Sequence, residues 1–291
     1  MEPGRLVPVH DTHLWVVERG DPAALPVFVL HGGPGLDHRM FADYLDPLTA
    51  DGRYRLVLLD QRAQGRSDRG VPPETWTLEQ MASDVSAVAA DLGAERYAVL
   101  GHSYGAFVAL QHAVDAPGGA VATIVSGGLP SASYLSGLDA QLESFEPVAL
   151  RERVTRSWRA EPTVSTDEDA LALVHDQLPF HFRDPQDPRI SEYAAATADM
   201  RVAAAVLRHF AGAEYGGIEV RDRLHRIPQP LLACTGRYDR VCPPAAATEI
   251  AQGAPRGELV IFEESGHLSF VEEPQRYHDV VADFLDRAGA A

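Results

Sequence analysis

The sequence predicts an α/β protein in which helices cover both faces of a mostly parallel sheet of about eight strands. Short apolar runs, each closed by a glycine or a polar residue, recur along the chain, as is typical of strands that are buried on both faces. Stretches with apolar residues at helical spacing separate these runs, and such alternation favours a parallel sheet. The alternation stops once, for a long helical interval, and then resumes.

The predicted elements follow one another in a regular order. Two β-like runs, 6–9 and 13–18, flank a polar pair and predict an antiparallel hairpin. Buried strands are expected at the apolar runs 27–30, 56–59, 97–100, 121–125, 230–234 and 258–262. Helices are expected at 78–92, 104–114 and 272–287.

The long interval, residues 130–224, contains no strand-like run, and helical segments rich in Ala, Leu and Arg alternate there with loops. We interpret it as a helical cap that is inserted in the core. The core itself is then formed by residues 1–129 and 225–291.

Composition excludes several classes of protein. The chain has 291 residues, 45% apolar and 23% charged, which is ordinary for a globular protein. A formal net charge of −17 repels phosphate backbones, so nucleic acid is not an expected partner. No apolar run approaches the ~18 residues that cross a bilayer, and residues 1–20 do not resemble a signal peptide. We expect a cytoplasmic protein with no membrane partner, and the oligomeric state stays open.

The strongest motif is Gly101-His102-Ser103-Tyr104-Gly105, a G-x-S-x-G run between a predicted strand and a predicted helix. That context is the one required by the nucleophile elbow of an α/β-hydrolase fold. A tight turn there leaves little space two residues before and after the serine, which explains a glycine at both positions. We therefore expect Ser103 to be a nucleophile.

A serine hydroxyl needs a base, and the base needs an acid to orient it. In this fold the chain order is serine, acid, histidine. Asp239 follows the first strand after the cap, and His267 follows the next strand. The sequence has 12 histidines, and this position distinguishes His267 from the others, such as His175 and His181, which we interpret as solvated or structural.

An oxyanion formed during acyl transfer needs backbone N–H donors. One is expected from Tyr104, which follows the nucleophile. The second is expected from Gly33, in the glycine-rich loop His31-Gly32-Gly33-Pro34-Gly35. Lysine and threonine do not follow this loop as they do in a phosphate-binding P-loop.

Together, several motifs resemble the prolyl iminopeptidase family of α/β-hydrolases. They are the loop 31–35, the run Asp60-Gln61-Arg62, the serine motif 101–105, the run 236–239 and the pair Gly266-His267. The resemblance implies removal of an N-terminal residue, often proline, from short peptides. It also implies a scaffold role for Arg62 and acidic side chains that hold the free substrate amine.

The sequence departs from the family pattern at these acidic positions. Arg240 follows the acid Asp239, and Arg208 stands where a cap acid is expected. An arginine there would repel an amine, so we expect Arg240→Glu to raise activity on aminoacyl amides. Glu192 and Glu214 are cap acids that are candidates for the missing role.

We therefore expect a serine hydrolase that acts on a small amide or on the N-terminal residue of a short peptide. An esterase or lactonase with the same three residues is the alternative, and a ligand-binding protein without turnover is the alternative from another class. No cofactor is expected, and no His/Cys/Asp cluster has metal-ligand spacing. Cys242 either lines the pocket or is a buried bystander. One or two cap aromatic residues are expected to line an apolar pocket, from the set Trp158, Tyr134, Phe180, Phe182 and Tyr215.

Overall fold

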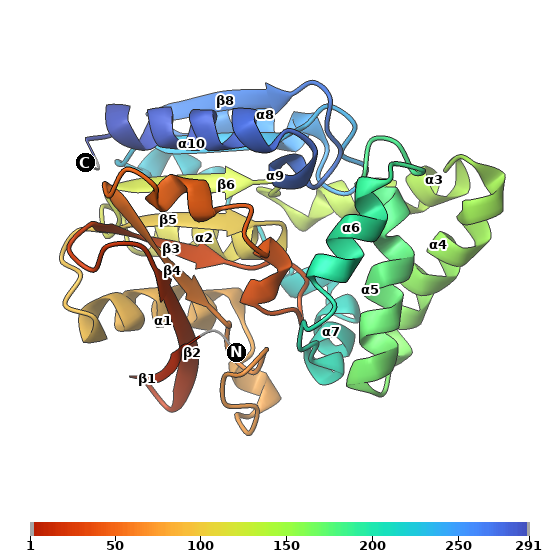
Figure 1. Ribbon diagram of the computed structural model, residues 1–291, viewed down its shortest axis with the longest axis horizontal. Coiled ribbons are helices and arrows are strands. Elements are labelled where there is room, and N and C mark those ends of the chain that lie inside the picture. Colours follow the sequence, from red (N-terminus) through yellow and green to blue (C-terminus); the bar gives the residue numbers. More distant parts are fainter. Residues whose placement is uncertain (1–2, 290–291) are drawn as a thin grey trace.

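The computed structural model describes residues 3–289 and contains an eight-stranded sheet in the order β1-β2-β4-β3-β5-β6-β7-β8 (Figure 1). The strands are β1 (Arg5–Val9), β2 (Thr12–Arg19), β3 (Leu25–Leu30), β4 (Tyr54–Leu59), β5 (Ala98–His102), β6 (Ala122–Ser126), β7 (Leu231–Gly236) and β8 (Gly257–Phe262). β2 pairs antiparallel with β1 and β4, and the other pairs are parallel. The predicted fold class is therefore confirmed. The expected core also includes residues 1, 2, 290 and 291, which lie outside the described part.

The central strands are apolar on both faces because each face packs against its own hydrophobic layer. In β3, Phe28 and Leu30 join one core cluster, and Val27 and Val29 join the other. Successive side chains of a strand point to opposite faces, so a continuous apolar run fills both layers.

Helices supply the outer wall of each layer. One cluster contains residues of α1 (Leu78–Asp91), α2 (Tyr104–Asp115) and α8 (Pro244–Gly253). The other contains residues of α9 (Ser269–Glu272) and α10 (Pro274–Arg287). The Thr77 side chain accepts a hydrogen bond from the Gln80 N–H, which explains why α1 begins at Leu78. The three-layer arrangement leaves the carboxyl ends of the parallel strands free to carry functional loops.

Between β6 and β7 the chain forms helices beyond the carboxyl ends of the parallel strands, on the right of Figure 1. They are α3 (Leu138–Glu143), α4 (Val148–Ala160), α5 (Asp167–His181), α6 (Arg189–Ala196) and α7 (Ala204–Ala211). All five lie in the interval 130–224, and we call this segment the cap. Among residues 3–289, no helix combines the length and apolar character that a membrane crossing requires.

Candidate active site

Ser103 lies at the junction of β5 and α2 in a backbone conformation that non-glycine residues rarely adopt, with φ 55° and ψ −121°. The neighbouring glycines make this turn possible. A Cβ at Gly101 would lie 2.0 Å from the Gly105 carbonyl oxygen, and one at Gly105 would lie 2.2 Å from the Leu30 carbonyl oxygen. The glycine spacing of the motif therefore reflects contacts between backbones that leave no room for a methyl group.

Asp239 and His267 meet although they follow different strands. Oδ2 of Asp239 lies 2.7 Å from Nδ1 of His267, and both side chains are buried. When Nδ1–H donates to the carboxylate, Nε2 is the ring nitrogen left to accept a proton. His267 and Ser103 both line the same cavity. The contact with Asp239 favours the His267 tautomer and ring orientation that a base next to a serine requires.

The Asp239 carboxylate is held by several further donors. Its Oδ1 accepts the N–H groups of Val241 and Cys242, at 2.9 and 2.8 Å, and its Oδ2 accepts the Thr235 hydroxyl at 2.8 Å. Burial alone would raise the pKa of Asp239, but the charge of His267 and these hydrogen bonds outweigh burial and lower the pKa. Asp239 is therefore an anion at neutral pH, fixed in one orientation.

Gly33 and Tyr104, the expected oxyanion donors, line the cavity beside Ser103. Tyr104 is the first residue of α2, where backbone N–H groups have no partner one turn earlier and the helix dipole favours negative charge. Gly33 has φ +113°, and a Cβ there would lie 2.9 Å from the Gly35 nitrogen. Glycine thus allows the loop to approach the site with its backbone.

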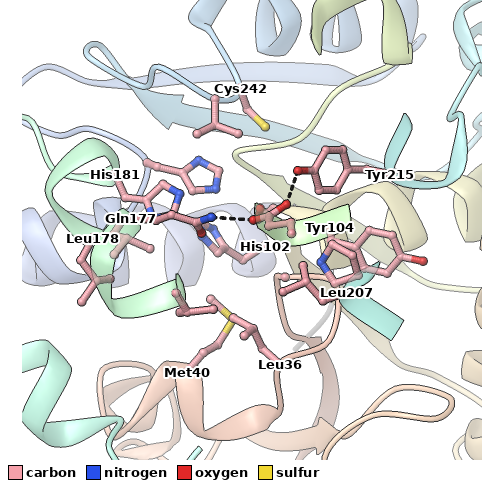
Figure 2. Close-up of a pocket in the computed structure, with 18 of the residues that line it drawn as sticks. Leu36, Met40, His102, Tyr104, Gln177, Leu178, His181, Leu207, Tyr215 and Cys242 are labelled. Atoms are coloured by element: carbon pink, nitrogen blue, oxygen red, sulfur yellow. Dashed lines mark hydrogen bonds between the residues drawn. The ribbon is translucent and has the colours of Figure 1, made fainter. Parts of the chain in front are cut away.

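The cavity lies between the carboxyl ends of the strands and the cap, and encloses about 900 Å³ including the part that is open to solvent. Figure 2 shows Leu36 and Met40 on one side and Cys242 on the other. Most of the wall is apolar, with contributions from Leu36, Met40, Phe107, Leu135, Val174, Leu178, Met200, Leu207 and Leu268.

One carboxylate on this wall, that of Glu161, is not distinguished by any sequence motif. Glu161, at the start of a short 3-10 helix (Glu161–Thr163), is only 3% exposed. The Tyr215 hydroxyl and the Gln177 amide, the latter at 2.6 Å, donate to its two oxygens (Figure 2). Burial raises the pKa of Glu161 to about 7, against the opposing effect of these hydrogen bonds. Among the described residues no cation forms an ion pair with it.

No local signal distinguished Glu161 from the other cap acids. Its burial depends on Gln177 and Tyr215, which are distant in sequence. Glu192 and Glu214, which the sequence suggested for this role, have exposed side chains and do not line the cavity.

Arg208 and Arg240, which stand where the family pattern has acids, also do not line the cavity. Arg208 is exposed and donates to the Val164 carbonyl at 2.6 Å. Arg240 is half-buried and donates to the backbone carbonyls of Phe180, Phe182 and Arg183. The expectation that Arg240 faces and repels a substrate amine is therefore wrong, because its guanidinium is directed at the cap backbone.

The cap aromatic residues divide as the sequence suggested. Trp158 and Tyr215 line the cavity, whereas Phe180 and Phe182 are buried outside it. The Tyr134 hydroxyl donates to Glu249. Of the two possibilities for Cys242, the structure selects a place on the wall.

Two other histidines pack around His267. The rings of His102 and His181 lie 4.9 and 5.3 Å from its ring, centroid to centroid. Burial lowers the pKa of His181 to about 3 and holds that of His102 well below its usual value. Both rings are thus neutral neighbours of His267. His181, which the sequence suggests is solvated or structural, is partly buried and lines the cavity wall.

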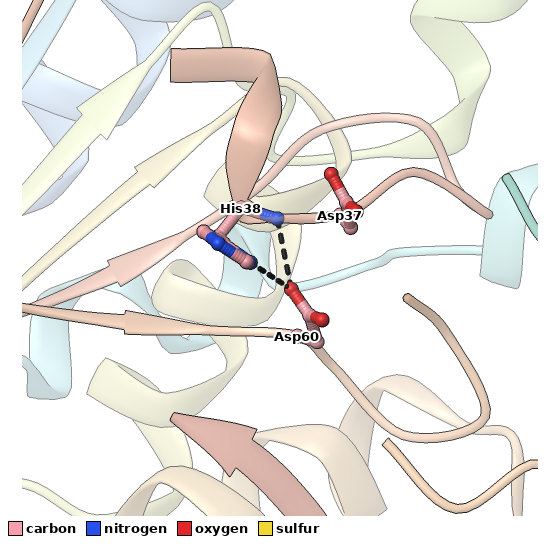
Figure 3. A group of neighbouring side chains, drawn as sticks. All are labelled: Asp37, His38 and Asp60. Carbon is pink, nitrogen blue, oxygen red and sulfur yellow. Dashed lines mark hydrogen bonds and ion pairs between the residues drawn. The ribbon is translucent and has the colours of Figure 1, made fainter. Parts of the chain in front are cut away.

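Asp37 and His38, which follow the loop 31–35 in the chain, form a buried cluster with Asp60 (Figure 3). Their ligand-type atoms all lie within 4.8 Å of one another, but hydrogen bonds occupy the carboxylate oxygens. Asp60 accepts His38 Nδ1 at 2.5 Å and the Arg66 N–H at 2.7 Å, and Asp37 accepts the Arg201 N–H at 2.9 Å.

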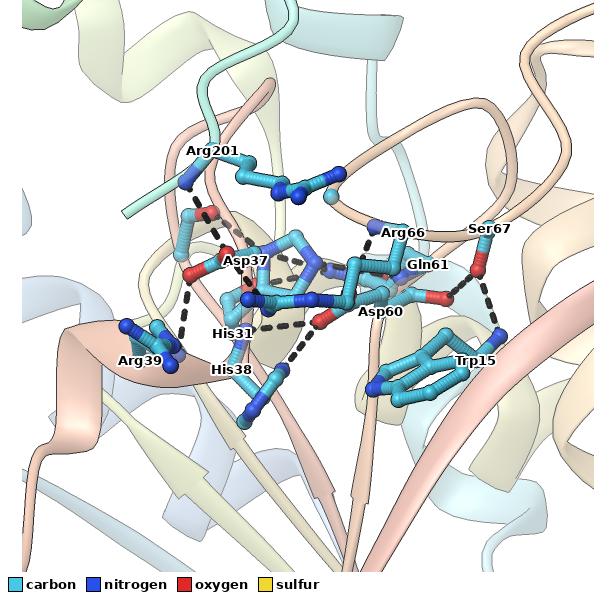
Figure 4. A network of polar contacts seen from close by, with 12 residues as sticks. Trp15, His31, Asp37, His38, Arg39, Asp60, Gln61, Arg66, Ser67 and Arg201 are labelled. Atoms are coloured by element: carbon cyan, nitrogen blue, oxygen red, sulfur yellow. Dashed lines mark hydrogen bonds and ion pairs between the residues drawn. The ribbon is translucent and has the colours of Figure 1, made fainter. Parts of the chain in front are cut away.

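The same cluster connects three segments of the chain (Figure 4). Asp37 belongs to the loop after β3, Asp60 follows β4, and Arg201 belongs to the cap segment before α7. The Ala203 N–H also donates to the Gly35 carbonyl at 2.7 Å. These contacts fix the loop that carries Gly33 against the cap.

Arg62, from the same Asp-Gln-Arg run, has no exposed side-chain surface. It donates to both carboxylate oxygens of Asp84, at 2.8 and 2.7 Å, and to Asp11 at 2.8 Å. It is not among the residues that line the cavity, which fits a scaffold role.

The order of the strands, the sharp turn at Ser103 and the inserted cap together are typical of an α/β-hydrolase. Residues 26–274 match the family described as alpha/beta hydrolase fold, and the chain belongs to this family. Relatives and solved structures narrow the comparison further. A proline iminopeptidase of Clostridium botulinum is 26% identical over 274 residues, with 90% of each chain covered.

Two solved structures illustrate the range of activities on this fold. The proline iminopeptidase of Mycobacterium smegmatis has a TM-score of 0.76 and 26% identity, with 98% of each chain covered. An esterase of Thermogutta terrifontis has a TM-score of 0.71 and 21% identity, with 95% of this chain and 94% of that chain covered, and shows the fold alone. The chain is therefore an α/β-hydrolase with both peptidase and esterase neighbours.

Proposed function

We propose that this protein is a serine hydrolase whose substrates carry a free amine. It hydrolyses a small amide or removes the N-terminal residue of a short peptide. One observation carries the choice of substrate: a buried carboxylate, Glu161, lies on the cavity wall with neutral donors only. A buried anion without a cation is costly. A substrate ammonium group would supply the missing charge.

The reaction would follow an acyl-enzyme route. The hydroxyl of Ser103 attacks the substrate carbonyl while Nε2 of His267 takes its proton, and Asp239 stabilises the imidazolium that forms. The N–H groups of Gly33 and Tyr104 would stabilise the oxyanion. His267 then returns the proton to the leaving amine, and water releases the acyl group by the reverse sequence of proton transfers.

Glu161 would act by binding rather than by chemistry. Its ionised carboxylate accepts hydrogen bonds from Gln177 and Tyr215 and has capacity left for a donor from the substrate. An N-blocked substrate has no ammonium group, and it would leave the carboxylate unpaired. This site takes the place of the acids that the sequence lacks at Arg208 and Arg240.

The largely apolar wall supports a second candidate, hydrolysis of a small ester or lactone by the same residues. Esters have better leaving groups and need less assistance from the acid. Such a substrate would be held by apolar contact alone.

Paired chromogenic substrates distinguish hydrolysis of free-amine amides from hydrolysis of esters. We would measure kcat/KM for prolyl and alanyl anilides, for their N-blocked forms and for short-chain esters, with wild type, Ser103→Ala and Glu161→Gln. The proposal expects the wild type to prefer free-amine anilides and Glu161→Gln to reduce that preference by about 10-fold or more, because a hydrogen bond to a charged group is lost. Ser103→Ala should abolish turnover of every substrate.

Glu214→Gln is the matched control, since it removes an exposed cap acid away from the cavity. It should leave the preference for free amines unchanged. Serine-dependent turnover of esters alone would support the second candidate instead. Binding without turnover in the wild type would indicate a ligand-binding protein on a hydrolase fold.

A further inference from the structure

The C-terminal end of α5 is held by one side chain of the loop that carries Asp239. Nη1 of Arg240 donates to the carbonyls of Phe182 and Phe180, at 2.6 and 3.1 Å, and Nη2 donates to the carbonyl of Arg183 at 3.1 Å. Its guanidinium carbon also lies 5.3 Å from the centroid of the Phe145 ring. Three backbone carbonyls within four residues at this end are thus held by one guanidinium.

Arg240 does not contact the carbonyl of His181, and this carbonyl accepts a hydrogen bond from the candidate base. The N–H of His267 donates to it at 2.6 Å. Glu272 adds a second connection, because its two oxygens accept the N–H groups of Arg183 and Gly266, at 2.8 and 2.7 Å. The segment 180–183 therefore contacts the loop of the candidate acid and the loop of the candidate base.

We propose that Arg240 is a positioning residue that fixes the end of α5 against both loops and so sets the position of His267 relative to Asp239 and Ser103. This inference rests on the proposed function only in that it takes these three residues as the reacting groups. Arg240 does not line the cavity, and it acts on His267 through the segment that carries the His181 carbonyl.

The chemistry of this contact favours arginine in particular. The last carbonyls of a helix have no partner within the helix, and a cation there is also favoured by the helix dipole. A planar fork with several donors reaches several carbonyls at once, which an ammonium group does not. Burial lowers the pKa of Arg240, but the group remains charged because its usual pKa is so high.

The same helix carries the substrate-binding side of the cavity. Gln177 and His181 of α5 line the wall, and Gln177 donates to Glu161. A displacement of α5 would therefore move the base and the carboxylate subsite together. This connection gives a reason for an arginine beside Asp239.

The test measures the reactivity of Ser103 without any knowledge of the natural substrate. We would determine the second-order rate of inactivation by phenylmethylsulfonyl fluoride, with mass spectrometry to locate the label. Variants are Arg240→Met and Arg240→Lys, and the control is Arg237→Met. Arg237 stands three positions earlier and forms an exposed ion pair with Glu263.

For Arg240→Met we expect inactivation at least about 10-fold slower than wild type, because small misplacements of reacting groups are costly. Arg240→Lys should be intermediate, and Arg237→Met should stay within about twofold. Millimolar guanidinium should restore part of the rate in Arg240→Met alone, which a general loss of folding would not allow. Circular dichroism and the melting temperature would show that each variant is folded at the assay temperature.

A folded Arg240→Met with the wild-type rate, or a loss that guanidinium leaves unchanged, would overturn the inference. If Arg240→Met does not fold, Arg240→Lys takes its place in the test. A rate of inactivation of Arg240→Lys equal to that of wild type would then overturn the inference. A wild-type enzyme that carries no label on Ser103 would overturn the proposed function and this inference together.

Discussion

Oδ2 of Asp239 lies 2.7 Å from Nδ1 of His267, although 28 residues and a whole strand separate them in the chain. The same carboxylate accepts two backbone N–H groups and one hydroxyl. These donors fix the orientation of the carboxylate that His267 contacts. This relationship leads to the first prediction.

Asp239→Asn should preserve the fold and reduce kcat by about 10³- to 10⁴-fold. The asparagine oxygen would still accept the N–H groups of Val241 and Cys242, so its amide NH₂ would face the histidine. His267 would then hold its proton on Nε2, the wrong nitrogen for a base. Steady-state kinetics on any turned-over substrate measure the effect, with the exposed Asp68→Asn as control. Activity near that of wild type would rule out Asp239 as the orienting acid.

Gly105→Ala should damage both stability and activity. Its Cβ would lie 2.2 Å from the Leu30 carbonyl oxygen, so the elbow must shift. We expect a loss of about 1–3 kcal/mol in the free energy of unfolding and a fall in kcat of about 100-fold. Gly137→Ala is the control, because nothing lies within 4 Å of a Cβ there, and urea unfolding compares the two. Equal stability of both variants would contradict the steric account of the motif.

The preference for free amines should depend on pH through Glu161. Its pKa is raised to about 7, so the carboxyl is neutral below that pH and cannot pair with an ammonium group. The ratio of kcat/KM for free-amine and N-blocked anilides should rise as pH increases through about 7. It should fall again above about 8, where the substrate α-amine loses its proton. In Glu161→Gln the rise through pH 7 should vanish, and a rise that persists there would assign the titration to another group.

Arg62→Met should be strongly destabilising without a direct effect on chemistry. It leaves Asp84, which is 1% exposed, without its cation. Breaking a buried pair in this way costs about 3–5 kcal/mol. Arg287→Met breaks an exposed pair with Glu258 and should cost about 0–1 kcal/mol. The midpoints of urea unfolding compare the two variants, and similar midpoints would refute a scaffold role for Arg62.

Arg240→Glu should lower activity on aminoacyl amides, in contrast to what the sequence suggested. A carboxylate at this position would face the carbonyl oxygens of Phe180, Phe182 and Arg183, which repel it. We expect a lower melting temperature and a fall in kcat/KM for alanyl anilide of about 10-fold or more. A gain in kcat/KM would instead indicate that Arg240 faces the substrate amine and repels it.

Much of the fold can be predicted from local patterns in the sequence. The run 27–30 is apolar throughout, and the structure places its alternate residues in the two hydrophobic layers. The glycines around Ser103 indicated a turn without space for side chains, and the contact distances at Gly101 and Gly105 agree. Asp239 and His267 were recognised because strand order places their loops at one edge of the sheet.

The direction and burial of individual charges were decided by the tertiary structure. Glu161 resembles any solvated cap acid in the sequence, and only packing against Gln177 and Tyr215 buries it. Arg240 was expected at the substrate, but the chain at the end of α5 offers backbone carbonyls to its guanidinium. The sequence alone determined the strands, the elbow and the order of the three candidate residues Ser103, Asp239 and His267, because periodicity and turn sterics are local. Which charges face the cavity depends on segments that meet only when the chain is folded.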